Sequence, residues 1–111
     1  MPQIIILPHF FRQLKRYIKK HRDLKASLVA ALNHFNKDQH AALGHSLYKV
    51  RLTTPSLSRG KSGAFRLIVL LLEVEDFIVP VTLYFKGDRA DISLSELKQH
   101  LRIILLELQR K

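Results

Sequence analysis

The sequence predicts an α+β fold: a small, mostly antiparallel sheet of about four strands, with an N-terminal helical hairpin on one face and a C-terminal helix. Three patterns predict it. Apolar residues recur at helical spacing over residues 9–36, residues 45–86 are rich in alternating apolar and polar side chains, and a capping sequence opens a leucine-rich stripe at residue 93. The 111 residues suffice for one hydrophobic core, so we expect a single domain over residues 1–111.

The N-terminal third predicts a short strand and two helices. Residues 3–7 are β-branched or apolar and lie between two prolines, which favours a strand, and Pro8 suits the first turn of the helix that follows. That helix, over residues 9–21, has a very basic outer surface, and a second helix begins after Asp23. The side chains expected to face the core are Phe10, Leu14, Tyr17 and Ile18 in the first helix and Leu24, Leu28, Leu32 and Phe35 in the second.

Three further strands are predicted after a loop that ends at Gly44. Residues 45–52 and 77–86 alternate, whereas residues 64–73 are so apolar that we place them in the middle of the sheet. Residues 53–63 form a polar connection between two of these strands. Pro80 lacks a backbone donor, so we expect it near a sheet edge or at a bulge.

Ser93 and Glu96 have the spacing of a capping box and open the last helix. Its apolar stripe is predicted to consist of Leu94, Leu97, Leu101, Leu105 and Leu108. Ile103, Ile104 and Leu106 widen this stripe beyond what one sheet face needs. The extra width indicates either a deeper core or a surface for a partner.

The strand alternation predicts a cluster of cations on one face of the sheet. The residues that share this face are Lys49, Arg51, Arg66, Tyr84 and Lys86, with Lys61 on the adjoining glycine-bounded loop. The opposite face is expected to supply Tyr48, Val50, Val81, Leu83 and Phe85 to the core. Because neighbouring cations repel one another, such a cluster persists most readily where an anion binds, and an aromatic among them suits stacking on a base.

Composition narrows the class of partner and of chemistry. The formal charge of +10 and the isoelectric point near 10.3 indicate a polyanionic partner, which charge alone leaves open as nucleic acid, an anionic membrane or an acidic protein. Without cysteine there is no disulfide, no thiolate chemistry and no common zinc ribbon, and we expect neither metal nor cofactor. The N-terminus lacks a signal-peptide pattern and the longest apolar run, residues 67–72, is too short to span a membrane, so we expect a soluble, cytoplasmic protein.

Four motifs follow one another along nearly the whole chain. They are Phe-Arg-x-Leu-Lys-Arg-x-x-Lys-Lys at 11–20, Leu-Tyr-Lys-Val-Arg at 47–51, Gly-Lys-Ser-Gly-x-x-Arg at 60–66, and Tyr-x-Lys at 84–86 before a Ser-x-x-Glu helix start. In this order and spacing the chain resembles the RelE/ParE superfamily of toxins from type II toxin-antitoxin systems, and within it the RelE/HigB-like branch that cleaves RNA.

The resemblance implies a RelE-like fold and cleavage of messenger RNA in the ribosomal A site without a metal, by attack of a ribose 2′-hydroxyl on the adjacent phosphate. It implies catalytic roles for Arg51, Arg66, Tyr84 and Lys86, and RNA or phosphate binding by Lys15, Lys19, Lys49 and Lys61. The partners that it implies are a cognate antitoxin, messenger RNA and the ribosome, with operator DNA as a partner of the toxin-antitoxin complex.

The chain departs from the family pattern at two places. Ala64 and Phe65 stand where many relatives have glycine and a small residue, and no aromatic acid-base residue follows Phe85. His100 is expected to face solvent and not to act in catalysis, and His45 is a still weaker candidate for the acid-base residue. Two other functions therefore stay open: a ParE-like inhibitor of DNA gyrase, which the clustered cations argue against, and a catalytically silent relative that binds nucleic acid or antitoxin.

Overall fold

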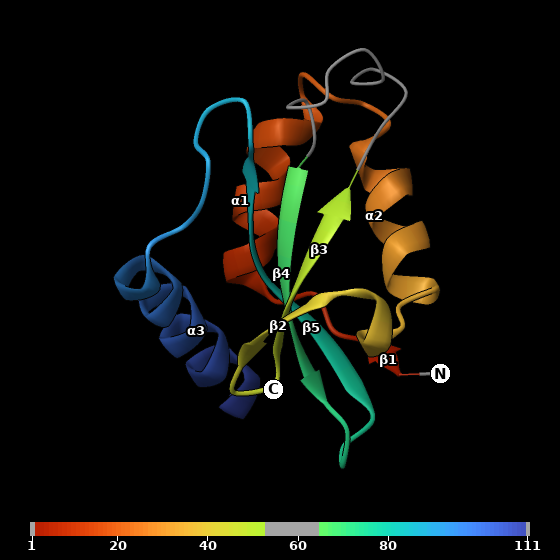
Figure 1. Cartoon of the computed structure of the whole chain (residues 1–111), viewed down its shortest axis with the longest axis vertical. Coiled ribbons are helices and arrows are strands. Elements are labelled where there is room, and N and C mark those ends of the chain that lie inside the picture. The colour runs from red at the N-terminus through yellow and green to blue at the C-terminus, as the bar shows by residue number, and fades with distance from the viewer. Residues whose placement is uncertain (1, 53–64, 111) are drawn as a thin grey trace.

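The computed structural model describes residues 2–52 and 65–110 (Figure 1). Along the chain, its elements are β1 (Gln3–Ile4), α1 (Pro8–Ile18), α2 (Leu24–Asn33), the short 3₁₀ helix η1 (Lys37–Gln39), β2 (Ala41–Gly44), β3 (Leu47–Leu52), β4 (Phe65–Leu72), β5 (Phe77–Phe85) and α3 (Leu94–Gln109). The predicted polar connection, with Lys61 and Ala64, lies outside the described residues.

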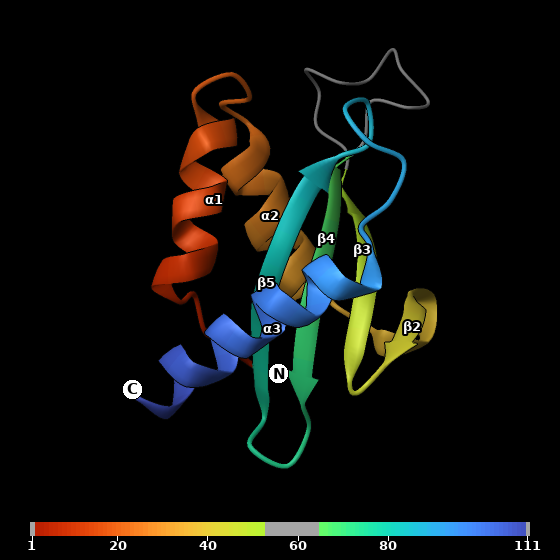
Figure 2. The ribbon, with the colours of Figure 1, turned by 90° about the vertical axis from the view of Figure 1, so that its left-hand side faces the viewer.

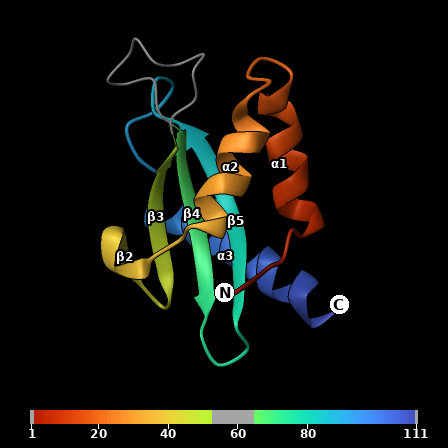
Figure 3. The same ribbon diagram turned by 90° about the vertical axis from the view of Figure 1, so that its right-hand side faces the viewer.

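The strands form one sheet in the order β1-β5-β4-β3-β2, in which only β1 and β5 run parallel. Seen from opposite sides, α3 crosses in front of the sheet in Figure 2 and α2 in Figure 3, so these two helices cover opposite faces. Helix α1 lies along β5, with α2 beside it. The predicted α+β class, with two N-terminal helices, a mostly antiparallel sheet and a C-terminal helix, is therefore confirmed.

The sheet has five strands because residues expected in a loop form an edge strand. All four residues of β2 are exposed, so no alternation in the sequence marks it. His45 and Ser46, both with positive φ (54° and 65°), make the turn into β3, which begins at Leu47 and not at residue 45.

The N-terminal helices have the predicted inner faces but different ends. Phe10 and Leu14 are buried in α1, as are Leu24 and Leu28 in α2. Helix α1 begins at Pro8 and ends at Ile18, short of the predicted residue 21, and only two of the five residues of the predicted first strand pair with β5.

A bulge occurs where the sequence places Pro80. The register pairs Ile68 with Thr82 and Val69 with Pro80, so Val81 is an extra residue on β5. The missing backbone donor of the proline is thereby accommodated as predicted.

The buried stripe of α3 is rotated from the prediction. Leu97 and Ile104 are buried and Leu101 and Leu108 pack against the core, whereas Leu94 is 67% exposed and Leu105 40% exposed. Of the residues that widened the stripe, Ile104 deepens the core, while Ile103 and Leu106 are exposed. Among the described helices, none is both long and apolar enough to cross a membrane.

Candidate functional site

Three of the predicted site residues form one row across the sheet. Arg51 on β3 pairs with Arg66 on β4, which in turn pairs with Tyr84 on β5. Lys49 lies two residues before Arg51 on β3, so it is on the same face of the sheet. Side chains opposed in this way have Cβ atoms about 5 Å apart, so the alternation of the sequence predicted their proximity correctly. We call Lys49, Arg51, Arg66 and Tyr84 the cationic cluster.

Arg66 carries the strongest sign of a ligand. Its side chain is partly buried, and its Nη1 atom is buried without a hydrogen-bond partner in the described structure. A buried guanidinium donor left unpaired destabilises the folded state, and an anion is the natural group to satisfy it. Arg51 beside it is exposed, so the row is open to solvent at that end.

Tyr84 is held by its surroundings at both the ring and the hydroxyl. The residue is 4% exposed, Arg89 Cζ lies 5.7 Å from the ring centroid, and the hydroxyl donates to Asp91 Oδ1 at 3.0 Å. Burial and the hydrogen bond to Asp91 raise the pKa of Tyr84 to about 12. The hydroxyl therefore keeps its proton at neutral pH, and the covered ring does not offer a face for stacking.

Asp91 joins the cluster although nothing in the sequence pattern singled it out. Its Oδ1 accepts hydrogen bonds from Lys49 Nζ at 3.1 Å and from the Ile92 N–H at 2.8 Å, besides that from Tyr84. The Ile92 bond and then the Lys49 bond lower the pKa of Asp91, so the carboxylate is ionised at neutral pH. Only its place shortly after the Tyr-x-Lys motif hinted at the site.

Lys86 lies beyond the strand that was expected to contain it. Strand β5 ends at Phe85, and Lys86 is exposed in the turn that follows. Gly87 belongs to the same turn, where any Cβ would collide with the Phe85 ring. Lys86 therefore stands next to the row rather than in it.

The segment over residues 86–93 is tied to the start of α3. Arg89 Nε donates to the Asp91 carbonyl oxygen at 3.0 Å, and its two terminal nitrogens donate to the Glu96 carboxylate at 2.8 and 2.7 Å. Ser93 Oγ accepts from the Glu96 N–H at 3.1 Å, so the predicted cap is present at this hydrogen bond. These bonds fix Asp91 against the sheet.

The two helical lysines predicted to bind RNA do not join the cluster. Lys15 and Lys19 are exposed at α1 and its C-terminal end, and Lys15 Nζ lies 5.7 Å from the Phe11 ring centroid. Any RNA contact that they make would come from α1 and its C-terminal end and not from the sheet.

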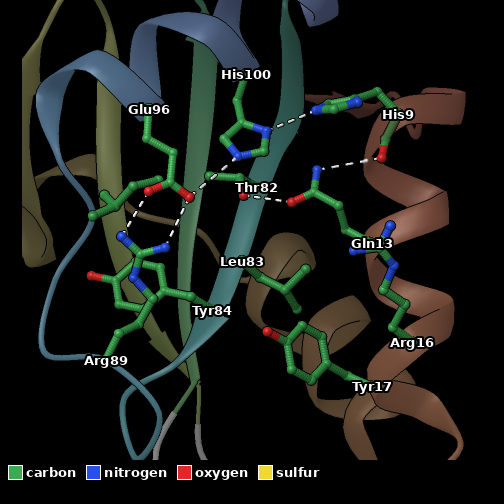
Figure 4. Close-up of a pocket in the computed structure, with 11 residues that line it drawn as sticks. His9, Gln13, Arg16, Tyr17, Thr82, Leu83, Tyr84, Arg89, Glu96 and His100 are labelled. Atoms are coloured by element: carbon green, nitrogen blue, oxygen red, sulfur yellow. Dashed lines mark hydrogen bonds and ion pairs between the residues drawn. The ribbon is translucent and has the colours of Figure 1, made fainter.

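A second polar group of residues joins α1 to β5 and α3 around a cavity of about 290 Å³ (Figure 4). At its centre, Gln13 Oε1 accepts from Thr82 Oγ1 at 2.6 Å, and Gln13 Nε2 donates to the carbonyls of His9 and Val81 at 3.3 Å. The amide thus satisfies the hydroxyl of Thr82, a buried polar side chain in the core.

His9 and His100 complete this second group, which we call the latch (His9, Gln13, Thr82, His100 and Glu107). His9 Nε2 and His100 Nδ1 are 2.8 Å apart, and the Glu107 carboxylate accepts from the His9 N–H at 3.0 and 3.1 Å. Burial lowers the pKa of both rings, with nearby charges as smaller causes. The expectation that His100 faces solvent is wrong, because its side chain is only 20% exposed.

The described residues offer no group of three or more His, Asp or Glu side chains arranged to hold a metal ion. The candidate site described above is formed by two guanidinium groups, an ammonium group, a phenol and the carboxylate of Asp91.

Two comparisons with known proteins, one by sequence and one by structure, agree on the same kind of toxin. The sequence model of the RelE toxin of the RelE/RelB toxin-antitoxin system matches residues 9–109. A solved structure of a double arginine-to-alanine mutant of the E. coli toxin RelE, in the free state, is similar with a TM-score of 0.54 and 17% identity, over 88% of this chain and 95% of that one. No curated protein sequence matches the chain significantly.

Proposed function

The chain belongs to the RelE family of toxins from type II toxin-antitoxin systems, and we propose that it is an endoribonuclease that cuts messenger RNA in the ribosomal A site without a metal. The observation that carries this proposal is the row of Arg51, Arg66 and Tyr84, in which one guanidinium nitrogen of Arg66 is buried without a hydrogen-bond partner among the described residues. A phosphate is an anion of the right charge and shape for such a row, because guanidinium binds it through two parallel donors.

The proposed reaction is an internal transesterification. The ribose 2′-hydroxyl loses its proton and its oxygen forms a bond to the adjacent phosphorus, while the bond from phosphorus to the 5′ oxygen breaks. The products are a 2′,3′-cyclic phosphate and a 5′-hydroxyl that has gained a proton. The enzyme must align the attacking oxygen, stabilise the charge of the phosphorane and supply proton transfer at both oxygens.

The cations of the cluster suit the phosphate part of this chemistry. Arg51 and Arg66 stay charged at all relevant pH values and would bind the two non-bridging phosphate oxygens. Lys49, two residues before Arg51 on β3, would also bind the phosphate. The exposed Lys86 would contact the neighbouring phosphate or protonate the leaving oxygen. Lys61, outside the described residues, remains a proposed phosphate ligand.

A cognate antitoxin is the partner that the family membership implies. We propose that it covers the cationic cluster with acidic residues, or packs on the exposed apolar residues of α3, Ile103 and Leu106. A complex with operator DNA would use the antitoxin as well.

Growth inhibition tests the proposal directly. We expect expression of the wild-type chain to stop growth and expression of Arg66→Ala to leave growth unaffected, with equal amounts of folded protein. Arg102→Ala is the matched control, because Arg102 is exposed on α3. Full toxicity of Arg66→Ala would exclude the cationic cluster as the site.

A further inference from the structure

We propose that Asp91 is a further catalytic residue of this reaction, the general base that takes the proton from the attacking 2′-hydroxyl. The inference rests on the proposed ribonuclease function and names the group that the cationic cluster lacks. Asp91 is an acidic side chain in hydrogen-bond contact with that cluster, through Lys49 and Tyr84.

A base needs a lone pair, and the other members of the cluster do not present one. Arg51, Arg66 and Lys49 are donors without an acceptor in their charged forms. Tyr84 has lone pairs, but its hydroxyl donates to Asp91 and holds its own proton at neutral pH. The proton of the 2′-hydroxyl therefore has one ionised acceptor to go to in this group, the Asp91 carboxylate.

The position of Asp91 suits contact with RNA. Its side chain is 63% exposed, while Lys49 is 27% exposed and Tyr84 lies beneath at 4%. The carboxylate is thus the more exposed partner in its hydrogen bonds to Lys49 and Tyr84, and Tyr84 is the neighbour of Arg66 in the row. A substrate held by these cations would bring its ribose to the carboxylate.

The carboxylate is also fixed in place. Oδ1 takes three hydrogen bonds, and the main chain of Asp91 is tied through Arg89 to Glu96 on α3. A base held within hydrogen-bond reach of its proton contributes about 10²- to 10⁴-fold to rate. The hydrogen bond from the Ile92 N–H and then that from Lys49 lower the pKa of Asp91, so the carboxylate is ionised at neutral pH.

The proton balance of the step is complete. The 2′-hydroxyl proton moves to the Asp91 carboxylate as the bond from O2′ to phosphorus forms. The bond from phosphorus to the 5′ oxygen breaks as that oxygen takes a proton from a lysine ammonium such as that of Lys86, and water then removes the proton from Asp91 and returns one to the lysine. No oxidant, reductant or further reactant is required.

The test uses the intact chain acting on ribosome-bound messenger RNA at pH 7, with rate and apparent affinity measured at several enzyme concentrations. Asp91→Asn retains the shape and an acceptor oxygen but is no longer a base, so we expect kcat to fall about 10²- to 10⁴-fold with KM changed less than about threefold. Asp91→Glu retains a carboxylate and is expected to recover part of the loss. Asp88→Asn, the same change in the turn before it, is the control and should cut at the wild-type rate.

A substrate with sulfur in place of the scissile 5′ oxygen separates the base from other roles, because a thiolate leaves without needing a proton. We expect the ratio of the wild-type rate to the Asp91→Asn rate to be the same on this substrate as on normal RNA, since the attacking hydroxyl still needs its base. If the gap closes, Asp91 acts on the leaving group and the proposal is overturned.

Three other results would also overturn it. If Asp91→Asn cleaved at the wild-type rate and only Asp91→Ala were slower, Asp91 would have a structural role and not act as the base. Faster cleavage or tighter RNA binding by Asp91→Asn would make the carboxylate an obstacle that occupies the phosphate position. Absence of cleavage by the wild-type chain would remove the ribonuclease function itself, whereas the first two results leave that function standing.

Discussion

The molecule contains two neighbouring polar groups, which meet on β5 at Thr82 and Tyr84 and differ in how completely they are paired. In the latch, the amide of Gln13, the hydroxyl of Thr82 and the facing nitrogens of His9 and His100 all have partners within the protein. In the cationic cluster, a guanidinium nitrogen of Arg66 is buried without a partner among the described residues, and the exposed carboxylate of Asp91 contacts Lys49 and Tyr84. A satisfied network stabilises a fold, whereas an unsatisfied one is maintained for a ligand.

The largest expected effect is on the chemistry of the cationic cluster. Arg66→Lys keeps the positive charge but loses the planar pair of donors, so we expect cleavage to fall about 100-fold, as when one donor to a transition-state oxyanion is removed. The loss of Nη1 should not lower the thermal unfolding temperature, since this atom has no hydrogen-bond partner among the described residues. Arg102→Lys on α3 is the control in a single-turnover cleavage assay. A rate within threefold of wild type for Arg66→Lys would show that charge alone suffices.

A change in the latch should have the opposite effect: it should lower the unfolding free energy and leave the cleavage rate nearly unchanged. Gln13→Ala leaves the buried Thr82 hydroxyl without its acceptor and is expected to cost about 1–3 kcal/mol of unfolding free energy. Denaturant unfolding measures this, with Lys15→Ala on the exposed side of the same helix as the control. Cleavage by Gln13→Ala should stay within about threefold of wild type at a temperature where both are folded, and a larger loss would place the latch in the active site.

The sequence predicted which strand residues of the cationic cluster share a face of the sheet, but it did not predict the contacts made by the loop that follows. Alternation alone assigned Arg51, Arg66 and Tyr84 to one face, because β3, β4 and β5 are regular there and the bulge lies beyond Thr82. Asp91 follows the last strand in an irregular segment where no periodicity specifies direction, so its contact with Lys49 and Tyr84 was missed.

Helix α3 shows a second limit. Its leucine-rich sequence fits more than one helical phase, and the phase that buries Ile104 leaves Leu94 and Leu105 outside. That rotation turns His100 toward His9, which sequence spacing between residues so far apart cannot reveal. Likewise, β2 is paired by its backbone alone and carries no signal in its exposed side chains.

A smaller effect concerns pH and belongs to the latch. Because burial lowers the pKa of His9 and His100 below the ordinary 6.5, the unfolded chain binds more protons, and the stability that these rings contribute above pH 6.5 is lost as the pH falls toward their folded pKa values. We expect the unfolding free energy to decline between about pH 6.5 and pH 5. Asp91 and Glu96, whose pKa values are lowered, lose their contribution only below the ordinary carboxyl range.

The control for this effect is His100→Gln, which removes one titrating ring and should flatten the decline. Denaturant titrations at half-unit pH steps measure it for both proteins. An unchanged slope in His100→Gln would mean that groups outside the latch govern stability in this range.

The smallest expected effect is at α1. Since Lys15 and Lys19 are exposed at α1 and not on the sheet, we expect the double change to alanine to lower cleavage less than about threefold and to reduce the salt dependence of RNA binding slightly, by about one phosphate contact per lysine at most. Lys49→Ala, inside the cluster, is the comparison and should have the larger effect. Equal losses in the two variants would extend the active surface from the sheet onto α1.

The central claim is that the cationic cluster cuts messenger RNA on the ribosome, and mapping of RNA 5′ ends tests it most directly. Purified wild-type chain and Arg66→Ala are added to messenger RNA with translating ribosomes and without them. We predict new 5′ ends only with ribosomes and only with the wild-type chain, each bearing a hydroxyl. Identical cuts by Arg66→Ala, or no cuts under either condition, would contradict the claim.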